Sequence, residues 1–502
     1  MDNKLIEKLK ELYSIFELAR KYDHAAGIVG FDFETIVPED ARESESEILD
    51  FLMNERFKLV SSDKVKNLII DLHSHIDEIE CPLDRRFIEL KYEDYLKTKN
   101  ITPEFNMKMN KIYSKSYIDW HNAKNKGDYN LFKDSFKKVI EISKEEINLR
   151  ENKLPNMYDN MLNDCEKGIL TNELDVFFNE LKVGLIDLLN KIKGSKHVIR
   201  DDFLNRKVAI HKQKEFSNYL LNLNGYDFKR GCIAETEHPF TSEVAKDDAR
   251  VTTHYYENMV LSNIYSIIHE GGHAIFMQNE PKEDYECFIN DEISNGMHES
   301  VSRFFENVIG RSKEYVHIIY PKFIETFEEF KDITEEELYE AINIVKPSLI
   351  RTEADEVTYG LHIVIRYEME RLIVDGKINI NDVPKMWNKL YKDYLGVDVL
   401  NDKEGVLQDV HWSGGFGYFP SYAIGNAYNA MYLKELEKEF SLGDAILAKD
   451  FKKINNWLKN HVFINANRLD PKDWIKNITN KELTAKDFLE YLNNKYKEIY
   501  RF

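Results

Sequence analysis

The pentapeptide at 269–273, within the stretch SIIHEGGHAIF, has a histidine at each end and a glutamate in second place. Apolar residues recur at helical spacing through 259–277, so we predict a helix there. Positions four apart on a helix point in nearly the same direction, so His269 and His273 can share one cation. Glu270 lies about 100° around the helix from His269 and can act as a general base for metal-bound water without being a ligand. The pattern predicts a catalytic metal site; the alternative is a buried helix whose histidines are merely hydrogen-bonded.

A catalytic zinc site needs a third protein ligand beside the two histidines. Downstream of His273, residues 291–306 are predicted to form another helix, with Ser294 or Asn295 as its cap. A carboxylate on this second helix would complete the arrangement of one broad class of zinc peptidases. The spacing alone does not choose among three carboxylates: Glu292, Glu299 and Glu306.

Gly271 and Gly272 stand inside the predicted helix, where each costs about 1 kcal/mol of stability relative to alanine. A helix with a purely structural role would gain nothing from them. We therefore hypothesise that the substrate, or a second element of the fold, approaches the helix closely at these two positions.

Six short blocks follow one another along the chain, and together they resemble the carboxypeptidase Taq family of metallocarboxypeptidases. In this sequence the blocks are H-P-F at 238–240, D-x-R-x-T at 248–252, H-E-x-x-H at 269–273, H-E-S at 298–300, I-R-x-x-A-D at 350–355 and G-x-x-Q-D-x-H-W at 405–412. Val301 departs from the family, which usually has Gln or Gly after the fourth block. The departure concerns the contacts around Glu299 rather than Glu299 itself.

The resemblance implies that His269, His273 and Glu299 bind the metal and that Glu270 is the catalytic base. The implied metal is one zinc ion per chain, while cobalt or another divalent ion suits the same ligands. The implied activity is the release of C-terminal amino acids, one at a time and with broad preference, from peptides that have a free C-terminus. The implied fold is mainly α-helical and two-lobed, with a long central groove and a small β-sheet beside the active site. The implied assembly is a homodimer.

Peptide hydrolysis also needs hydrogen-bond donors for the oxyanion that develops in the transition state. The stretch 405–425 is rich in glycine and aromatic residues and is predicted to be an ordered loop. It offers His411, Tyr418 and Tyr422. Resemblance to more distant helical zinc dipeptidases favours His411 and Tyr422 as the donors and leaves Tyr418 to substrate binding. The alternative for either tyrosine is a role in packing.

A carboxypeptidase must bind the terminal carboxylate of its substrate, and the arginine fork suits that task. Arg250 and Arg351 are the candidates. Each has a structural alternative: Arg250 can pair with an aspartate at 247–248, and Arg351 with Asp355 one helical turn away. His238 is predicted to support the substrate near the metal, although His-Pro also fits a plain turn.

The ring nitrogens of zinc-binding histidines that face away from the metal are usually held by a carboxylate or a carbonyl. Asp355 and Asp409 are the candidates for this role, and the sequence does not choose between them. The sequence is also compatible with two other functions. A zinc endopeptidase or oligopeptidase of similar fold would share the metal site without needing a carboxylate-binding arginine. An inactive relative could act as a peptide-binding scaffold, but the presence of Glu270 argues against it.

The rest of the chain must supply the elements that position these residues. Its 502 residues are 43% hydrophobic and 31% charged, with only 11 prolines and 21 glycines, which is typical of a mainly helical protein. Helical periodicity is clearest at 4–22, 44–62, 84–98, 131–152, 173–192, 212–223, 315–331, 335–347, 361–374, 426–439 and 485–500. The stretch 250–256 predicts a strand with Arg250, Thr252, His254 and Tyr256 on one face. We expect one domain over 1–502, built from two helical lobes.

Charge and cysteine content limit the partners and the compartment. The net charge of −20 repels phosphate backbones, so nucleic acid is not expected as a partner. The four cysteines are scattered without a C-x-x-C pair, which favours a reducing compartment. No run approaches the roughly 18 apolar residues of a membrane span. We therefore expect a cytoplasmic protein that does not enter the membrane.

Overall fold

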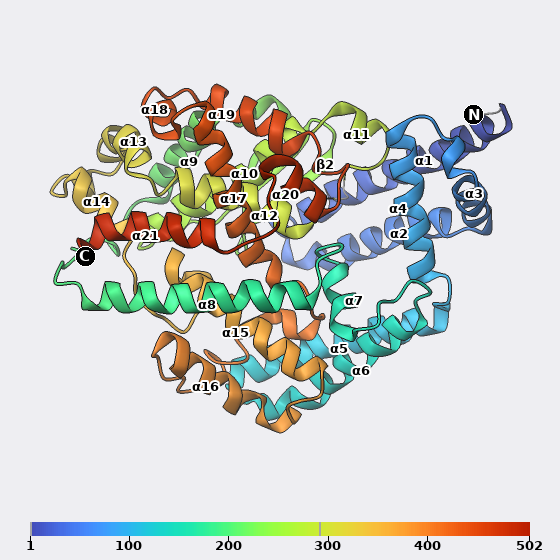
Figure 1. Ribbon diagram of the computed structural model, residues 1–502, viewed down its shortest axis with the longest axis horizontal. Helices are drawn as coiled ribbons and strands as arrows, with labels where there is room; N and C mark the ends of the chain where they lie inside the picture. Colours follow the sequence, from blue (N-terminus) through green and yellow to red (C-terminus); the bar gives the residue numbers. More distant parts are fainter. Residues whose placement is uncertain (1–2, 291–292) are drawn as a thin grey trace.

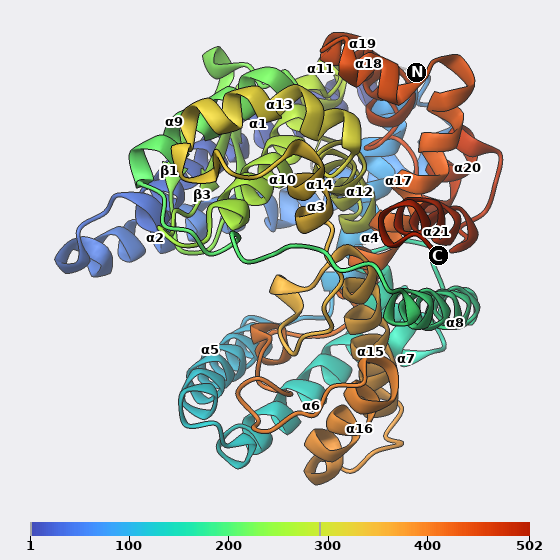
Figure 2. The same cartoon turned by 90° about the vertical axis from the view of Figure 1, so that its left-hand side faces the viewer.

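The computed structural model describes residues 3–290 and 293–502, and α-helices account for most of them. Figures 1 and 2 show these helices gathered in two groups, one above the other. The upper group begins with α1 (Asn3–Thr35), α2 (Arg42–Val60), α3 (Asp63–Ser74) and α4 (Pro82–Thr98). It continues with α9 (Ile210–Asn224), α10 (Val260–Asn279), α11 (Lys282–Glu286), α12 (Asn295–Arg303), α13 (Lys313–Thr326) and α14 (Glu335–Ile342). It ends with α17 (Pro420–Glu439), α18 (Leu442–Leu447), α19 (Phe451–Leu458), α20 (Pro471–Thr479) and α21 (Lys486–Tyr500).

The lower group is smaller and is formed by two separate parts of the chain (Figure 2). It contains α5 (Pro103–Lys126), α6 (Lys133–Leu149), α15 (Glu356–Val374) and α16 (Val383–Leu395). Two helices lie where the groups meet: α7 (Met157–Asn163) and α8 (Thr171–Gly194) (Figure 1). The mainly α-helical fold class is therefore confirmed, together with its small sheet.

The sheet has three strands in the order β1-β3-β2. β1 (Ile233–Glu235) is parallel to β3 (Asp248–Thr253), and β2 (Thr241–Ala245) is antiparallel to β3. The tight turn between β2 and β3 places Asp247 at a φ of 66°, a conformation that aspartate tolerates. The predicted strand at 250–256 is only partly right, because β3 ends at Thr253. His254 and Tyr256 lie beyond the strand, so the predicted four-residue face does not form.

A continuous hydrophobic core extends through both groups of helices. It includes Phe136 of α6, Leu185 of α8, Ile268 of α10 and Trp387 of α16, all fully or almost fully buried. A second, smaller core lies among the N-terminal helices and includes Leu12. α10 runs through the upper core, with β3, α9 and α12 among its neighbours. This central helix carries the H-E-x-x-H residues.

The other predicted helices agree with the structure within a few residues at most ends. α1 is longer than the predicted 4–22, and the helix predicted at 315–331 ends at Thr326. Within residues 3–290 and 293–502, no helix combines the length and the apolar character needed to cross a membrane.

Candidate active site

Three side chains from two helices converge at one point in the upper group. His269 and His273 lie on α10, and Glu299 lies on α12. The Nε2 atoms of His269 and His273 are 3.7 and 3.6 Å from Oε2 of Glu299. One donor atom from each residue lies within 4.8 Å of the other two. Zinc donors sit about 2.0–2.2 Å from the ion, so the donors of a tetrahedral site are roughly 3.4 Å apart. The three residues therefore fit a single divalent cation.

The other ring nitrogen of each histidine is occupied. Nδ1 of His269 is 2.9 Å from Oε2 of Glu306, and Nδ1 of His273 is 2.5 Å from Nδ1 of His298. These contacts turn both Nε2 atoms toward Glu299. Burial and the nearby His273 lower the pKa of His298 well below its usual value, so its ring is neutral. Glu306 and His298 thus orient the two candidate ligand rings, a role that the sequence pattern did not indicate for either.

Neither aspartate that was considered for this orienting role touches the histidines. Asp355 is the N-cap of α15, where its side chain accepts hydrogen bonds from the backbone N–H groups of Val357 and Thr358. Asp409 accepts a hydrogen bond from Arg351 at 2.9 Å. The predicted pairing of Arg351 with Asp355 is also wrong. Residues 351–353 form a 3₁₀ turn, and α15 begins only after Asp355, so the two are not one α-helical turn apart.

The third ligand candidate is held by its own helix. Oε1 of Glu299 accepts a hydrogen bond from Nε of Arg303 at 2.8 Å, and Oε2 accepts one from the hydroxyl of Ser302 at 3.2 Å. Arg303 also donates to Glu306 at 3.2 Å, so one guanidinium bridges both carboxylates. Burial alone would raise the pKa of Glu299, but His269 and Arg303 outweigh it and hold that pKa well below its usual range. Of the other two contenders, Glu306 bonds to His269, and Glu292 lies outside the described residues.

Glu270, beside the first histidine, is positioned by the sheet. Its side chain is 8% exposed, and its Oε2 accepts a hydrogen bond of 2.7 Å from the hydroxyl of Thr241 on β2. The same hydroxyl also lies 2.9 Å from the backbone carbonyl of Glu270. The residue just before β2 is tied in turn to β3, because three hydrogen bonds join Phe240 and Thr252. The H-P-F and D-x-R-x-T blocks therefore build the support for Glu270.

The two glycines of α10 are explained by neighbouring helices. A Cβ atom on Gly271 would lie 2.5 Å from Cδ2 of Leu221 on α9. A Cβ atom on Gly272 would lie 2.9 Å from the backbone Cα of Ser302 on α12. The close approach of a second element is therefore the reason for both glycines, and it brings the ligand-bearing helices α10 and α12 together.

The two candidate arginines differ in their surroundings. Arg250 forms a two-pronged ion pair with Asp248, with distances of 2.8 and 3.0 Å, and its guanidinium lies 5.0 Å from the Phe31 ring centre. This is the structural alternative foreseen for it. His238 is exposed between β1 and β2. Burial, followed by the nearby His238, lowers the pKa of His254.

Arg351 is linked to the candidate metal cluster through Tyr359. It pairs with the buried Asp409, and its Nη1 is 3.4 Å from the hydroxyl of Tyr359. The ring of Tyr359 lies 4.3 Å from the guanidinium of Arg303, the partner of Glu299. Tyr359 thus connects Arg351 to the ligand helix, and no sequence block pointed to it.

The loop that carries His411 ends earlier than predicted. α17 starts at Pro420, so Tyr422 lies in its first turn instead of in a loop. The His411 ring stacks on Tyr418 with 5.6 Å between centroids, and Tyr418 meets Tyr422 edge-on at 5.2 Å. Burial, followed by the positive charge of Arg366, lowers the pKa of His411 to about 4, so this ring is neutral. Burial raises the pKa of Tyr422 far above its usual value, so its phenol keeps its proton.

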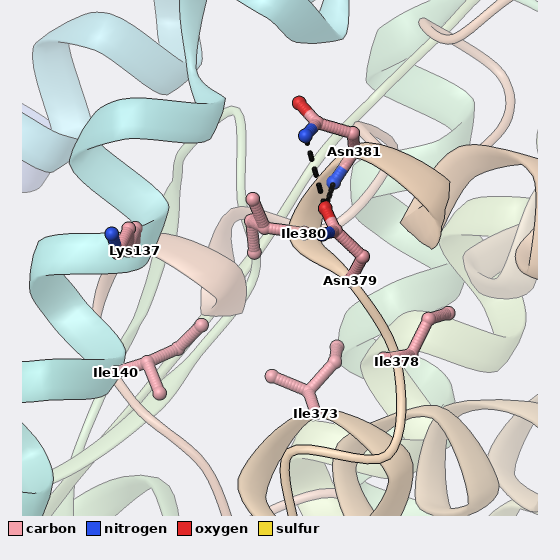
Figure 3. A pocket seen from close by; sticks show the side chains of 7 residues that line it. All are labelled: Lys137, Ile140, Ile373, Ile378, Asn379, Ile380 and Asn381. Atoms are coloured by element: carbon pink, nitrogen blue, oxygen red, sulfur yellow. Dashed lines mark hydrogen bonds between the residues drawn. The ribbon is translucent and has the colours of Figure 1, made fainter.

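A separate pocket of about 350 Å³ lies between α6 and residues 373–381 (Figure 3). Its lining consists of four isoleucines, two asparagines and one lysine: Ile140, Ile373, Ile378, Ile380, Asn379, Asn381 and Lys137. Because no histidine or carboxylate lines it, this pocket lacks the donors of a catalytic zinc site.

Comparison with known proteins places the chain in a family. The model of the carboxypeptidase Taq (M32) metallopeptidases matches residues 11–496. The chain is 38% identical over 495 residues to Carboxypeptidase 1 of Bacillus subtilis (strain 168), covering 98% of both proteins. It is 35% identical over 416 residues to Thermostable carboxypeptidase 1 of Thermus thermophilus, covering 81% of this chain and 82% of that protein.

The fold agrees as well. The crystal structure of the M32 carboxypeptidase from Deinococcus radiodurans R1 matches with a TM-score of 0.95 at 30% identity, covering 99% of this chain and 100% of that one. The family model covers residues 11–496, a range that contains His269, His273 and Glu299. The chain therefore belongs to the carboxypeptidase Taq (M32) family of metallopeptidases, and it is a metallocarboxypeptidase.

Proposed function

We propose that the protein is a zinc-dependent carboxypeptidase that removes single residues from peptide C-termini with broad preference, and that Glu270 is its general base. The observation that carries the proposal is the cluster of two imidazole nitrogens and one carboxylate oxygen within 4.8 Å, with Glu270 beside it. Two histidines and one glutamate are a donor set of catalytic zinc, and cobalt suits them too. When bound, the cation supplies a Lewis acid for the peptide carbonyl and lowers the pKa of water to about 7.

Glu270 takes a proton from the attacking water and passes it to the leaving amine. Its Oε2 is held by the hydroxyl of Thr241, which fixes the carboxylate plane and leaves Oε1 to receive the proton. Because Glu270 is almost completely buried, few solvent molecules compete for that oxygen.

His411 and Tyr422 donate hydrogen bonds to the developing oxyanion, and Tyr418 lines the substrate site. The phenol of Tyr422 is protonated, and the negative charge of Glu299 is among the causes of its raised pKa, which supports a position near the ligand cluster. The neutral imidazole of His411 has one N–H to donate. Donors of this kind act most strongly in a site from which water is excluded.

Arg351 binds the terminal carboxylate of the peptide. Asp409 holds its Nε and Nη2, while its Nη1 has only the long 3.4 Å contact with Tyr359. A guanidinium fixed on one edge presents the other edge for two parallel hydrogen bonds to a carboxylate. Arg250 is the weaker candidate because Asp248 occupies its fork. His238 remains proposed as a support for the substrate.

The proposal is tested with a set of peptides of different C-terminal residues, followed by mass spectrometry before chelation, after chelation and after zinc is returned. We expect single-residue ladders that disappear with chelation and reappear with zinc. Glu270→Gln is expected to bind zinc normally while turnover falls about 10²–10⁴-fold. Glu283→Gln, an exposed change on α11, serves as the matched control. Normal turnover by Glu270→Gln would remove the base assignment, and equal cleavage of a C-terminally amidated peptide would exclude an exopeptidase.

We also propose that the protein is a homodimer. The exposed apolar side chains of α2, among them Ile48, Phe51 and Phe57, support an interface on the N-terminal helices. Light scattering of the purified protein decides the point, since a mass of one chain would contradict it.

A further inference from the structure

Glu166, in the segment between α7 and α8, reaches the first turn of the ligand helix α12. Its Oε1 accepts a hydrogen bond of 2.5 Å from the backbone N–H of Gly296, and its Oε2 accepts one of 2.9 Å from the hydroxyl of Ser294. The side chain is completely buried. This carboxylate comes from the part of the chain where the two groups of helices meet.

The backbone N–H groups of residues 295–297, in the first turn of α12, donate to this segment and to the N-cap Ser294. The N–H groups at the start of a helix have no partners within the helix. Here the N–H of Asn295 donates to the carbonyl of Cys165 at 3.3 Å, Gly296 donates to Glu166, and Met297 donates to the Ser294 hydroxyl at 3.2 Å. Residues 165–166 therefore supply the outside partners of α12 and fix where this helix begins.

Only glycine allows the carboxylate to sit so close. A Cβ atom at Gly296 would lie 2.8 Å from Oε1 of Glu166. The partial positive charge of the helix start favours an anion at this position and offsets part of the cost of burying it. Burial nevertheless raises the pKa of Glu166 to about 7. A buried carboxyl group that is expensive to maintain points to a role beyond filling space.

The ligand Glu299 follows Gly296 by one turn of α12, and its other side is fixed as well. A Cβ atom on Gly425 of α17 would lie 3.1 Å from both Cβ and Cγ of Glu299. α12 is thus held at its start by Glu166 and along its length by α17. A shift or rotation of α12 about its start would carry the Glu299 carboxylate away from the two Nε2 atoms.

We propose that Glu166 is a positioning residue for metal binding: by anchoring the first turn of α12 it holds Glu299 opposite His269 and His273. The inference rests on the proposed function, because it takes those three residues as the metal ligands. It predicts that loss of the Glu166 contacts weakens zinc binding even though Glu166 does not touch the metal.

The test measures the zinc dissociation constant of the chelator-treated protein by competition with a metal-binding dye, together with the unfolding temperature. Glu166→Met removes both acceptors at similar volume and is expected to weaken zinc binding at least about 10-fold, as for other partners that orient metal ligands. Glu166→Gln keeps one acceptor oxygen and should restore the constant to within about threefold of wild type.

Asp159→Leu is the matched control. Asp159 is a buried carboxylate of the same region that accepts the backbone N–H of Thr171 at the start of α8 and has no hydrogen bond to α12. This variant should lower the unfolding temperature while leaving the zinc constant within about threefold of wild type. An equal loss of zinc affinity in Asp159→Leu and Glu166→Met would overturn the inference, as would wild-type affinity in Glu166→Met.

Two further variants keep the result decisive. If Glu166→Met does not fold, Gly296→Ala takes its place, since the added methyl group pushes the carboxylate away. A loss of about 10-fold supports the inference, and unchanged affinity overturns it. Glu299→Gln distinguishes an error in the ligand set from an error in the positioning role of Glu166. Unchanged zinc affinity in this variant contradicts the ligand set itself, whereas a loss in Glu299→Gln without a loss in Glu166→Met contradicts only the positioning role.

Discussion

At the scale of single residues, each functional side chain of the site uses some of its polar atoms to hydrogen-bond a neighbouring residue and leaves the others available. Nδ1 of His269 faces Glu306, and Nδ1 of His273 faces His298, so only the Nε2 atoms are left for the cation. Similarly, Asp409 occupies one edge of Arg351 and leaves the other. The hydrogen bonds made by these atoms therefore decide which atoms of each side chain remain available for a ligand.

Arg351→Met tests the carboxylate-binding role directly. Removing the guanidinium is expected to reduce kcat/KM about 10- to 100-fold for peptides with a free C-terminus, because charge-assisted pairs of this kind contribute about 1.5–3 kcal/mol. Zinc content should stay at the wild-type level, and steady-state kinetics with elemental analysis provide both readouts.

Arg250→Met is the comparison for that change. Because Arg250 is paired with Asp248, its loss should affect kcat/KM less than the loss of Arg351. The reverse order would transfer the carboxylate-binding role to Arg250.

His362 predicts a specific dependence of stability on pH. Burial, and then the positive charge of Arg351, lower the pKa of His362 to about 3, while the unfolded value is about 6.5. Below pH 6.5 the unfolded chain therefore binds a proton that the folded protein refuses, and stability falls as the pH is lowered. In His362→Gln the drop in unfolding temperature between pH 7 and pH 5 should be smaller than in wild type.

The exposed His121 offers the control for this experiment. His121→Gln should keep the wild-type difference between the two pH values. An unchanged drop in His362→Gln would mean that His362 does not contribute to the acid sensitivity.

The relative positions of the site residues could be predicted from the sequence only for those that lie on one helix. His269, Glu270 and His273 follow from helical geometry, whatever surrounds the helix. The choice of Glu299 did not follow, because it depends on how α12 packs against α10. Glu299 and Glu306 lie two turns apart on one side of that segment, and packing decides which one meets the Nε2 atoms. The pairing of Arg351 with Asp355 was wrong because it depended on where α15 begins.

At the scale of elements, the contacts of α12 with α10 and with α17 form the centre of the site. Glycines make these contacts possible: Gly272 lies against Ser302, and Gly425 lies against Glu299. The prediction of a loop through 425 was wrong at its end for the same reason. A glycine among aromatic residues is typical of irregular structure. Here Gly425 lies inside α17, where the absence of a side chain lets α12 pack closely.

Gly272→Ala should therefore be destabilising, although alanine favours helices. The added Cβ would lie 2.9 Å from backbone Cα of Ser302, so the helices must move apart, at a cost of about 1–3 kcal/mol. Gly30→Ala is the matched change, since a Cβ on Gly30 of α1 meets nothing within 4 Å. It should stabilise by about 0.5–1 kcal/mol. Denaturant unfolding measures both, and stabilisation by Gly272→Ala would contradict the packing argument.

At the scale of the whole molecule, one continuous core joins helices from distant parts of the chain. The last helix, α21, packs against both α8 and α17 and so fastens the end of the chain to its middle. A mainly helical protein could be predicted from composition and periodicity. The arrangement of the helices could not, because it depends on contacts between residues hundreds of positions apart. The single domain over 1–502 with two lobes and a groove stays a prediction.

A buried ion pair of Lys495 also joins α21 to α15, and its contribution to stability can be measured. The Nζ atom of Lys495 lies 2.7 Å from Oε2 of Glu356 on α15, and both side chains are buried. Lys495→Met removes the cationic partner of the buried Glu356 carboxylate, which keeps the 3.3 Å hydrogen bond from the Tyr496 hydroxyl, and should cost about 3–5 kcal/mol of unfolding free energy. The double variant Lys495→Met/Glu356→Gln should recover a large part of the loss. Lys497→Met, at an exposed position of the same helix, should change stability by less than about 0.5 kcal/mol.

Glu299 rests against Gly425, a residue that the ribosome adds long after it has made α10 and α12. A nascent chain that ends before α17 already contains His269, His273 and Glu299, but it lacks the helix that packs along α12. Under the proposed ligand set, ribosome-bound fragments that stop before Pro420 should therefore bind zinc more weakly than the full-length chain.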